Sequence, residues 1–465
     1  MRALDRVPRL TELVRNRTVR LAVTGLSQSG KTAFVTSLVY NLLGAVGRPA
    51  RLPFLRAAAE RRIQAARLCR PKGETVPEFP LRETVAALAA DPPHWPPSTT
   101  DLRQARLSLL FSHMGLLRLG VFLGRTAELH LEILDYPGEW LLDLPLLHQT
   151  YADWSQTTLS LAQRGVRAPL AREWLDYLAC HPADRESDPE TARQAHNLYR
   201  IFLTTCRGQE ELSFLQPGRF LNPGSIGDVS LLYFCPMPIA IGKRPRAGSI
   251  AALMEKRFEA YKRSVVEPFF AELARNIDRQ IVLIDVLRAL NAGADAFADQ
   301  RLALEAILAA FRFGRRSPLR WLFGTRIDRV LFAATKADHV PAVQRDHLEA
   351  LMSNLVEAPS LRARAAHARV AAAALASIRC TEDGTDVIDG RKVDIVIGLP
   401  QGGERRIRFF PGIVPVTPPP AGFWGERFTA FPVFQPPQIT RAADAGIPHI
   451  NLDKALEFLL EDVLA

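Results

Sequence analysis

A glycine-rich segment near the start of the chain has the residue types that bind a phosphate chain. Residues 25–32 read GLSQSGKT and fit the pattern G-x-x-x-x-G-K-[ST]. Successive backbone N–H groups of such a loop can surround dense negative charge, and the N-terminus of a following helix adds positive potential. We expect Lys31 to reach the β- and γ-phosphates and the Thr32 hydroxyl to bind Mg²⁺. The predicted nucleotide-binding residues of the loop are Gly25, Leu26, Ser27, Gln28, Ser29, Gly30, Lys31, Thr32 and Ala33.

A second motif, Asp135-Tyr136-Pro137-Gly138, follows a strictly alternating apolar segment. A carboxylate at the end of a strand beside a phosphate loop can hold the Mg²⁺ shell, so Asp135 is a predicted metal ligand. We expect Gly138 to donate its N–H to the γ-phosphate, so that the loop after it senses hydrolysis. Alone, a D-x-x-G tetrapeptide is also typical of an ordinary turn; its position after a phosphate loop favours the nucleotide role.

Glu139 and Lys31 are the candidate catalytic residues. Glu139 directly follows Gly138, where many GTPases carry a glutamine that orients water. An ionised carboxylate accepts a hydrogen bond from water but cannot donate one. We therefore expect slow or differently assisted intrinsic hydrolysis.

The tetrapeptide Thr335-Lys336-Ala337-Asp338 follows the apolar run VLFAA and matches the [NT]-K-x-D guanine reader of GTPases. The Asp338 carboxylate can accept two hydrogen bonds from the guanine edge, from N1–H and from the exocyclic N2–H. Adenine lacks this pair of donors and would leave a buried carboxylate unmatched. The Lys336 stem is expected to lie across the face of the base. The alternative is an exposed salt bridge at a strand end.

Two weaker segments complete the predicted site. Ser377 and Ile378 lie after the next apolar run and could offer a backbone N–H to the guanine carbonyl, although the sequence S-I-R departs from the usual S-A-K. The stretch Ser98-Thr99-Thr100 lies between the phosphate loop and Asp135. A threonine there can close over Mg²⁺, so Thr99 or Thr100 is a candidate metal ligand, with ordinary turn chemistry as the competing interpretation.

The elements that must position these groups alternate between strands and helices. Apolar runs of buried-strand type lie at 19–25, within 279–293, where the run leads to a turn, and within 329–340, where it ends in polar residues. Strand–helix alternation of this kind predicts an α/β fold of the P-loop NTPase, GTPase-like type, with a mostly parallel sheet and a large helical insertion. Residues 57–70 look helical, and 387–412 look like a β-hairpin added to the sheet.

The expected domain organisation divides the chain into four parts. Its length of 465 residues is too great for one ordinary core. The parts are the first half of a P-loop GTPase domain with a switch loop near 90–101 (residues 1–140), a mainly helical insertion (141–275), the second half of the GTPase domain (276–385), and a C-terminal hairpin, Pro- and aromatic-rich segment and terminal helix packed on the core (386–465).

Composition excludes several other classes of protein. Hydrophobic residues make up 48% and charged residues 23%, which is the balance of a folded globular chain. The net charge is +10, but the arginines are scattered among Asp and Glu, so we expect no specific nucleic-acid partner. The five cysteines show no metal-ligand spacing. Since no apolar leader is evident, we expect a cytoplasmic protein and leave open peripheral contact at the inner membrane.

Several strings together resemble the YcjX-like family of bacterial stress-associated GTP-binding proteins, over nearly the whole chain. The strings are GLSQSGKT, WPPSTTDL, LDYPGEWLLDLPLL, RQIVLIDVLRALNAG, FAATKADHV, FFPG and IPHINLDKALEFLL. The resemblance implies a GTPase-type core interrupted by a helical domain, with GTP or GDP and Mg²⁺ as ligands. It also implies a link to the phage-shock response to envelope stress. It does not supply a protein partner, so the effector stays unidentified.

The leading hypothesis is a GTP-binding switch with Mg²⁺-dependent hydrolysis. A P-loop ATPase or small-molecule kinase is the second reading, in which the T-K-A-D match is accidental. A scaffold that binds GTP without hydrolysing it is the third, favoured by Glu139 and by the departure at Ser377–Arg379. Product analysis separates them, since a GTPase releases free phosphate and a kinase transfers it.

Overall fold

The computed structural model describes most of the chain. The described residues are 16–26, 28–71, 76–97, 101–116, 122–224, 232–242, 244–275, 277–310, 327–365, 368–424, 431–440 and 446–465. The chain folds into two compact units. The first unit comprises Met1–Tyr136, Ile277–Asn291 and Thr325–Ala465, and the second comprises Pro137–Asn276 and Ala292–Gly324. The four-part division expected from the sequence stays a prediction.

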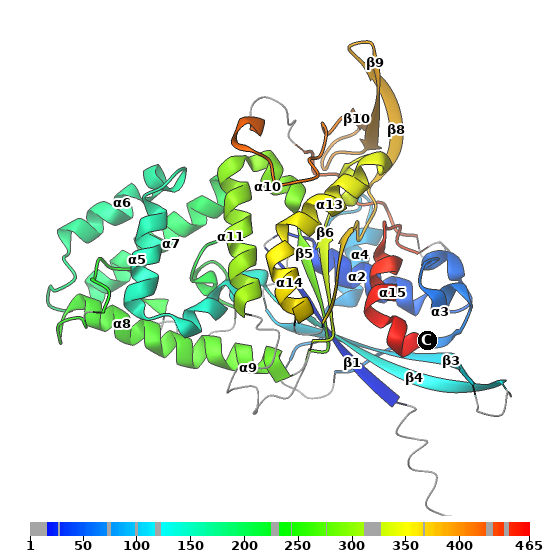
Figure 1. Cartoon of the computed structure of the whole chain (residues 1–465), viewed down its shortest axis with the longest axis horizontal. Coiled ribbons are helices and arrows are strands. Elements are labelled where there is room, and N and C mark those ends of the chain that lie inside the picture. Colours follow the sequence, from blue (N-terminus) through cyan, green and yellow to red (C-terminus); the bar gives the residue numbers. More distant parts are fainter. Residues whose placement is uncertain are drawn as a thin grey trace, which may run out of the picture. The chain divides into compact units, whose positions relative to one another are not determined.

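The first unit contains a seven-stranded sheet of order β2-β3-β4-β1-β5-β6-β7 (Figure 1). The strands are β1 (Asn16–Gly25), β2 (Ile63–Cys69), β3 (Arg103–Leu116), β4 (Phe122–Asp135), β5 (Arg279–Ile284), β6 (Arg329–Ala334) and β7 (Arg369–Ala374). The five strands from β4 to β7 run parallel, whereas β3 is antiparallel to β4 and to β2. The predicted α/β fold class with a mostly parallel sheet is confirmed.

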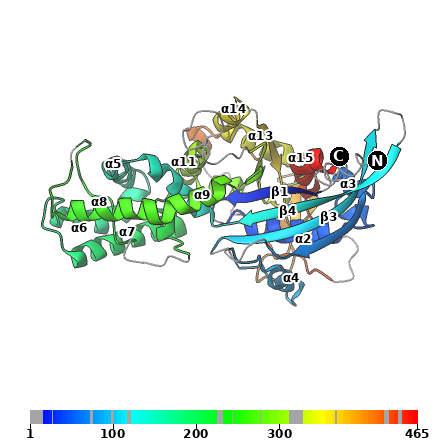
Figure 2. The ribbon, with the colours of Figure 1, turned by 90° about the horizontal axis from the view of Figure 1, so that it is seen from below.

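Helices cover both faces of this sheet. The helices of the first unit are α2 (Lys31–Leu43), α3 (Arg56–Ala59), α4 (Leu81–Ala89), α10 (Val286–Ala292), α13 (Arg345–Leu355), α14 (Glu357–Ala365) and α15 (Leu452–Leu464), with 3₁₀ turns at Pro49–Arg51, Ala337–His339, Ala342–Gln344 and Ala421–Phe423. After β1 the chain crosses to β2, which lies on one side of β1 in the sheet. After β6 it crosses to β7, in the opposite direction. Because parallel crossovers are right-handed, α2 and α13 must lie on opposite faces, as Figure 2 shows.

The core of the first unit joins α2 and α15 to the same face of the sheet. Val19, Leu21 and Val23 alternate along β1, so their side chains point to one face. They belong to one buried cluster with Phe34 of α2 and Leu456 of α15, all at most 2% exposed. The helix that follows the phosphate loop is therefore packed against the same core as the C-terminal helix.

Two expectations for the first unit were wrong. Of residues 57–70, only the first three are helical, as the end of α3, and the chain then enters β2, whose backbone pairs with β3. Tertiary pairing outweighs the helical propensity of Ala65 and Ala66 in this strand. The hairpin also does not extend the main sheet: β8 (Thr381–Ile388), β9 (Arg391–Gly398) and β10 (Ile407–Phe409) form a separate antiparallel sheet.

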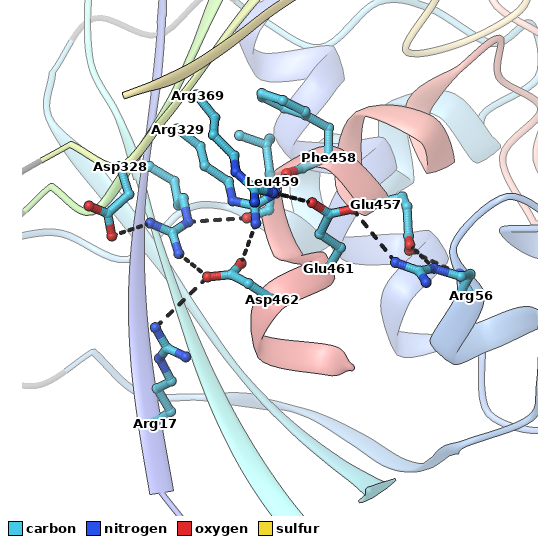
Figure 3. Close-up of polar contacts among 11 residues, drawn as sticks. Arg17, Arg56, Asp328, Arg329, Arg369, Glu457, Phe458, Leu459, Glu461 and Asp462 are labelled. Atoms are coloured by element: carbon cyan, nitrogen blue, oxygen red, sulfur yellow. Dashed lines mark hydrogen bonds and ion pairs between the residues drawn. The ribbon is translucent and has the colours of Figure 1, made fainter. Parts of the chain in front are cut away.

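Ion pairs fasten α15 to the amino-terminal ends of three neighbouring strands (Figure 3). Arg279, Arg329 and Arg369 are the first residues of β5, β6 and β7 and stand side by side in the register of the sheet. Arg279 donates to Asp462 at 2.7 Å, and Arg329 and Arg369 lie 2.8 and 2.9 Å from Glu461. Cations near the last turn of a helix also complement its dipole.

The second unit is helical. Its elements are η2 (Gly138–His148, 3₁₀), α5 (Tyr151–Ala162), α6 (Arg167–Cys180), α7 (Pro189–Gln209), η3 (Gly218–Phe220, 3₁₀), α8 (Ile250–Tyr261), η5 (Lys262–Val266, π), α9 (Glu267–Arg275) and α11 (Ala294–Ala310). Aromatic rings fill its interior: Trp154 stacks on Phe258 with ring centroids 5.1 Å apart, and Phe234 meets Trp154 edge-on. None of the helices within the described ranges is long and apolar enough to cross a membrane.

Candidate phosphate and base site

The phosphate loop connects β1 directly to α2. Gly30 adopts φ +84° and Gln28 adopts φ +60°, both in the left-handed region. Lys31 is the first residue of α2, and its Nζ donates to the carbonyl oxygens of Gly25 and Leu26 at 2.9 and 3.1 Å. The loop thus places an ammonium group and a helix N-terminus at one point, the combination that attracts phosphate. Ser27 lies outside the described residues.

Close backbone approach explains the glycine that begins the loop. A Cβ at Gly25 would collide with the carbonyl oxygen of Leu283 on β5 and with the Ser29 hydroxyl. That hydroxyl is buried and has no hydrogen-bond partner among the described residues. A buried polar atom without a partner carries a desolvation cost, which a bound oxyanion or cation shell would remove. The loop therefore fits a phosphate ligand.

Asp135 is the last residue of β4, which pairs in parallel with β1, the strand that precedes the phosphate loop. It is 1% exposed and lies in register with Val23 of β1. The next residue, Tyr136, shares a 2.8 Å hydrogen bond with the Thr24 hydroxyl, which also accepts from Gln280. Burial raises the pKa of Tyr136, so the phenol stays protonated and fixes the end of the strand.

The residues after Tyr136 belong to the second unit. Gly138 and Glu139 begin η2. The Glu139 carboxylate lies 3.5 Å from the Arg207 guanidinium of α7, and its side chain is 11% exposed. Gly218 packs against the Glu139 backbone so closely that any Cβ there would collide with it. The segment predicted to sense hydrolysis is therefore built into the helical unit.

The predicted base reader follows β6. The Thr335 N–H donates to Ile284 O at 2.9 Å, and Lys336 adopts φ +58°. Asp338 is 2% exposed; its Oδ2 accepts from the Cys380 N–H at 2.9 Å, and Nδ1 of His339 lies 3.3 Å from its Oδ1. Burial opposes ionisation, yet His339 and the Cys380 N–H hold the pKa of Asp338 below its usual value. The structure thus holds Asp338 as an ionised acceptor, with one protein contact at each carboxylate oxygen.

The loop after β7 is supported by the C-terminal segment. Ala376 and Ile450 exchange backbone hydrogen bonds of 3.0 and 2.8 Å, and the Arg379 N–H donates to Pro448 O. Ser377 and Ile378 lie between these contacts and are 9% and 4% exposed. Ile378 also packs in a small cluster with Ala33 of α2.

The sequence NLDKALEFLLEDVL predicts a terminal helix over residues 451–464, with the Asn451 side chain as its N-cap. Asn451 is at the N-cap position of α15 but adopts φ +58° and makes no side-chain cap. Its Nδ2 donates instead to Ala374 O at the end of β7. The expected capping role was therefore wrong, because the amide is used to join the C-terminal segment to the sheet.

Sheet topology brings the predicted segments to one edge. The predicted segments lie at or just after the carboxyl ends of β1, β4, β6 and β7, which run parallel in one sheet. They are the phosphate loop, Asp135, Thr335–Asp338 and Ser377–Ile378. The carboxyl ends of parallel strands are where α/β folds bind ligands. The Thr32 hydroxyl and the Asp135 carboxylate are oxygen donors of the kind Mg²⁺ prefers. Thr99 and Thr100, the other predicted ligands, lie outside the described residues.

Metal binding by protein side chains alone has no candidate in the described part of the chain. No group of three or more His, Cys, Asp and Glu residues that could hold a metal ion occurs there. Mg²⁺ usually keeps several waters and takes one or two protein oxygens plus substrate phosphates. Thr32 and Asp135 match that pattern of few protein ligands.

Comparison with known proteins identifies the family. The family model described as "YcjX-like family, DUF463" matches residues 19–464. The chain belongs to the YcjX-like family. Two curated YcjX relatives carry the name "Ras-like GTPase YcjX". The relative from Escherichia coli (strain K12) is 38% identical, over 97% of this chain and 96% of its own length. The relative from Shewanella oneidensis (strain ATCC 700550 / JCM 31522 / CIP 106686 / LMG 19005 / NCIMB 14063 / MR-1) is 34% identical, over 97% and 95%.

Sequence reasoning overlooked several polar residues at this site of the YcjX-like chain. Asp285 and Arg288 follow β5, and His339 contacts Asp338. Within the second unit, Arg207 contacts Glu139. Only Asp285 had a visible signal, since it is the first acidic residue after the buried run RQIVLI. The others are single residues without a motif. The fold brings Arg288 and Arg207 to their partners, whereas His339 directly follows Asp338 in the sequence.

Proposed function

We propose that this chain binds guanine nucleotide and hydrolyses GTP in a Mg²⁺-dependent reaction, acting as a nucleotide-dependent switch. The observation that carries the proposal is the alignment of the phosphate loop, Asp135 and the Thr335–Asp338 segment on parallel strands of one sheet. The name "Ras-like GTPase YcjX" of both relatives supports the reaction class.

Each part of this edge has a distinct role in the proposal. The loop amides and Lys31 bind and orient the phosphates and neutralise their charge. Asp338 accepts two hydrogen bonds from the guanine edge, the Lys336 stem covers the base face, and the backbone at Ser377–Ile378 contacts the guanine carbonyl. Thr32 and Asp135 would hold Mg²⁺, together with Thr99 or Thr100. When bound, that cation neutralises charge on the β- and γ-phosphate oxygens.

Glu139 is proposed to orient the attacking water as a hydrogen-bond acceptor. Its ion pair with Arg207 restricts the carboxylate, and a restricted acceptor is better placed than a mobile one. Because it cannot donate a hydrogen bond while ionised, we propose a slow intrinsic rate.

The switch output is proposed to reach the helical unit through η2. The Asp143 carboxylate in η2 accepts hydrogen bonds from the Gly218 N–H at 2.7 Å, the Arg219 N–H at 3.3 Å and the Tyr261 hydroxyl at 2.5 Å. Arg219 also stacks on Trp140, with its guanidinium carbon 3.2 Å from the ring centroid. A displacement of Gly138 on hydrolysis would therefore act on a packed element rather than on a loose loop.

A fluorescent GDP displacement assay tests the binding step. We expect GTP and GDP to displace the probe and ATP to fail, with binding weakened by EDTA and abolished in Lys31→Ala. Equal displacement by ATP would favour the ATPase or kinase reading. Single-turnover reactions then separate the remaining functions: free phosphate indicates a GTPase, a phosphorylated acceptor a kinase, and bound GTP that stays intact a scaffold.

The cellular part of the proposal is a role in the response to envelope stress, with a protein effector that is not identified. It rests on the family resemblance. The cytoplasmic location and peripheral inner-membrane contact stay predictions, which co-sedimentation with vesicles of inner-membrane lipid would test.

A further inference from the structure

Two polar residues after β5 lie between the two halves of the proposed nucleotide site. Asp285 directly follows the six buried residues of β5 and is itself 3% exposed. Arg288 lies one turn further on, in α10. Both belong to the string RQIVLIDVLRALNAG, which contains none of the nucleotide-binding motifs.

Asp285 contacts the base reader. Its Oδ2 lies 2.6 Å from Nζ of Lys336, and its Oδ1 accepts a hydrogen bond of 3.1 Å from the Arg288 N–H. The Asp285 side chain is 4% exposed, whereas that of Lys336 is 37% exposed. A buried, doubly engaged carboxylate therefore holds the end of a longer and more accessible cation. The stem of Lys336 is restrained from both its ends.

Arg288 contacts the phosphate loop. Its guanidinium donates a hydrogen bond to the Gln28 side-chain oxygen. Together the contacts form a chain from Gln28 through Arg288 and Asp285 to Lys336, entirely within the first unit. Gln28 of the phosphate loop and Lys336 of the base reader are 308 residues apart (336 − 28). They are thus joined by side chains of the segment that follows β5, the strand between β1 and β6.

The two residues at the ends of this chain of contacts have unusual backbone angles. Gln28 and Lys336, the two residues at the ends of the chain of contacts, have φ of +60° and +58°. Residues other than glycine rarely adopt such angles, and they persist only where surrounding contacts impose them. The pair formed by Asp285 and Arg288 contacts the side chains of both strained residues.

We propose that Asp285 and Arg288 are positioning residues that hold the base reader and the phosphate loop in their binding conformations, with Asp285 keeping the Lys336 stem aligned for a guanine base. The role toward the base rests on the proposed function, whereas the coupling between the two loops does not. The competing explanation is that Asp285 only stabilises the start of α10 through the Arg288 N–H.

A double-mutant cycle on nucleotide release distinguishes these explanations. The variants are Asp285→Asn, Lys336→Ala and the double substitution, and the readout is the dissociation rate of fluorescent GDP. We expect each single change to speed release about tenfold, and the double change to be no faster than Lys336→Ala alone. Additive effects, or unchanged release in Asp285→Asn, would overturn the proposal. Asp188→Asn is the matched control, because Asp188 caps α7 in the second unit.

A ligand-free measurement keeps this inference separate from the proposed function. Amide hydrogen exchange of the full chain without nucleotide is compared for wild type, Asp285→Asn, Arg288→Ala and Asp188→Asn. We expect Asp285→Asn to speed exchange in both 25–31 and 335–339, and Arg288→Ala to speed it mainly in 25–31. Unchanged exchange in both segments of Asp285→Asn would contradict the positioning role, even if the protein binds GTP. The expected exchange pattern in a protein that binds no guanine nucleotide would uphold the coupling and refute the proposed function.

Discussion

The Arg207 guanidinium lies 3.5 Å from the Glu139 carboxylate, so the candidate water-orienting residue is already engaged by a cation of the helical unit. Arg207 is near the end of α7, and Glu139 is one residue beyond Gly138. Arginine forms planar, directional contacts that orient a carboxylate better than lysine does. The pair makes Arg207 a candidate positioning residue for hydrolysis.

Removing either partner is predicted to slow hydrolysis without weakening nucleotide binding. We expect Glu139→Ala to lower the single-turnover rate about 100-fold, the lower end of what a positioned acid–base group contributes. Arg207→Ala should lower it about tenfold, because the carboxylate remains but loses its orientation. Arg193→Ala is the control, since Arg193 pairs with Glu190 on an exposed part of the same helix. Rates equal to wild type in both variants would exclude Glu139 from the reaction.

Two buried groups of the second unit are predicted to give opposite pH dependences of stability. Burial raises the pKa of Asp143 from 3.8 to about 6. Between these two pH values the folded unit binds more protons than the unfolded chain, so its stability falls as pH rises from 3.8 to about 6. Burial lowers the pKa of His196 from 6.5 to about 4, so its contribution is full above pH 6.5 and is lost as pH falls toward 4. Each shift corresponds to about 3 kcal/mol.

Because these two effects nearly cancel in wild type, single substitutions should expose them. Asp143→Asn leaves His196 unopposed, so the free energy of unfolding should fall by about 3 kcal/mol between pH 6.5 and 4 relative to wild type. His196→Asn should show the reverse slope. Urea denaturation at several pH values, followed by the fluorescence of the buried Trp154 and Trp174, measures both. Parallel curves for wild type and Asp143→Asn would contradict the assignment.

Asp338→Asn is predicted to change base selectivity. Xanthine has a carbonyl where guanine has the exocyclic amine, and an Asn amide donates a hydrogen bond to that oxygen whereas a carboxylate cannot. We expect GDP affinity to fall about 100-fold, since hydrogen bonds to a charged group are worth about 1.5–3 kcal/mol each, and xanthosine diphosphate affinity to rise. Displacement of a fluorescent GDP probe measures both. Asp386→Asn in the hairpin is the control, and unchanged selectivity in Asp338→Asn would refute the base reader.

Asp462→Asn is predicted to destabilise the first unit far more than Glu457→Gln. Asp462 contacts the guanidinium of Arg279, whose side chain is 2% exposed, and loss of its charge leaves that cation with fewer partners (Figure 3). We expect a loss of about 2–4 kcal/mol, against less than about 1 kcal/mol for Glu457, whose partner Arg56 is 63% exposed. Denaturant titrations compare the two variants, and equal losses would contradict the ranking.

Much of the first unit could be predicted, because several of its strands are continuous apolar runs in the sequence. Runs such as RQIVLI and RVLFAA are buried throughout, and buried parallel strands are continuous apolar runs. Strand β2 escaped prediction, because Ala65 and Ala66 favour helix and only pairing with β3 makes them extended. The separate sheet of β8–β10 escaped for a similar reason, since alternation predicts a hairpin but not its neighbours.

Residues of the candidate site could be predicted where binding requires fixed residue types at fixed spacing. They could not be predicted where their role depends on partners that the sequence does not reveal. Gly25 and Lys31 are recognisable because a phosphate loop needs a close approach and a cation at fixed spacing. Asp285 acts through Lys336, which is 51 residues away (336 − 285). His339 is adjacent to Asp338 but looks like any buried histidine. The role of Asn451 was misjudged because its partner, Ala374 O, is distant in sequence.

The order of the strands in the sheet has a consequence for synthesis on the ribosome. β1 lies between β4 and β5, yet β5 begins only at Arg279, after residues 137–276 of the helical unit have been translated. The nascent chain must therefore carry β1 with one edge unpaired while the helical segment emerges, and unpaired edges invite association with other chains. We expect nascent chains stalled before β5 to recruit chaperones, and those stalled after β6 to be released from them.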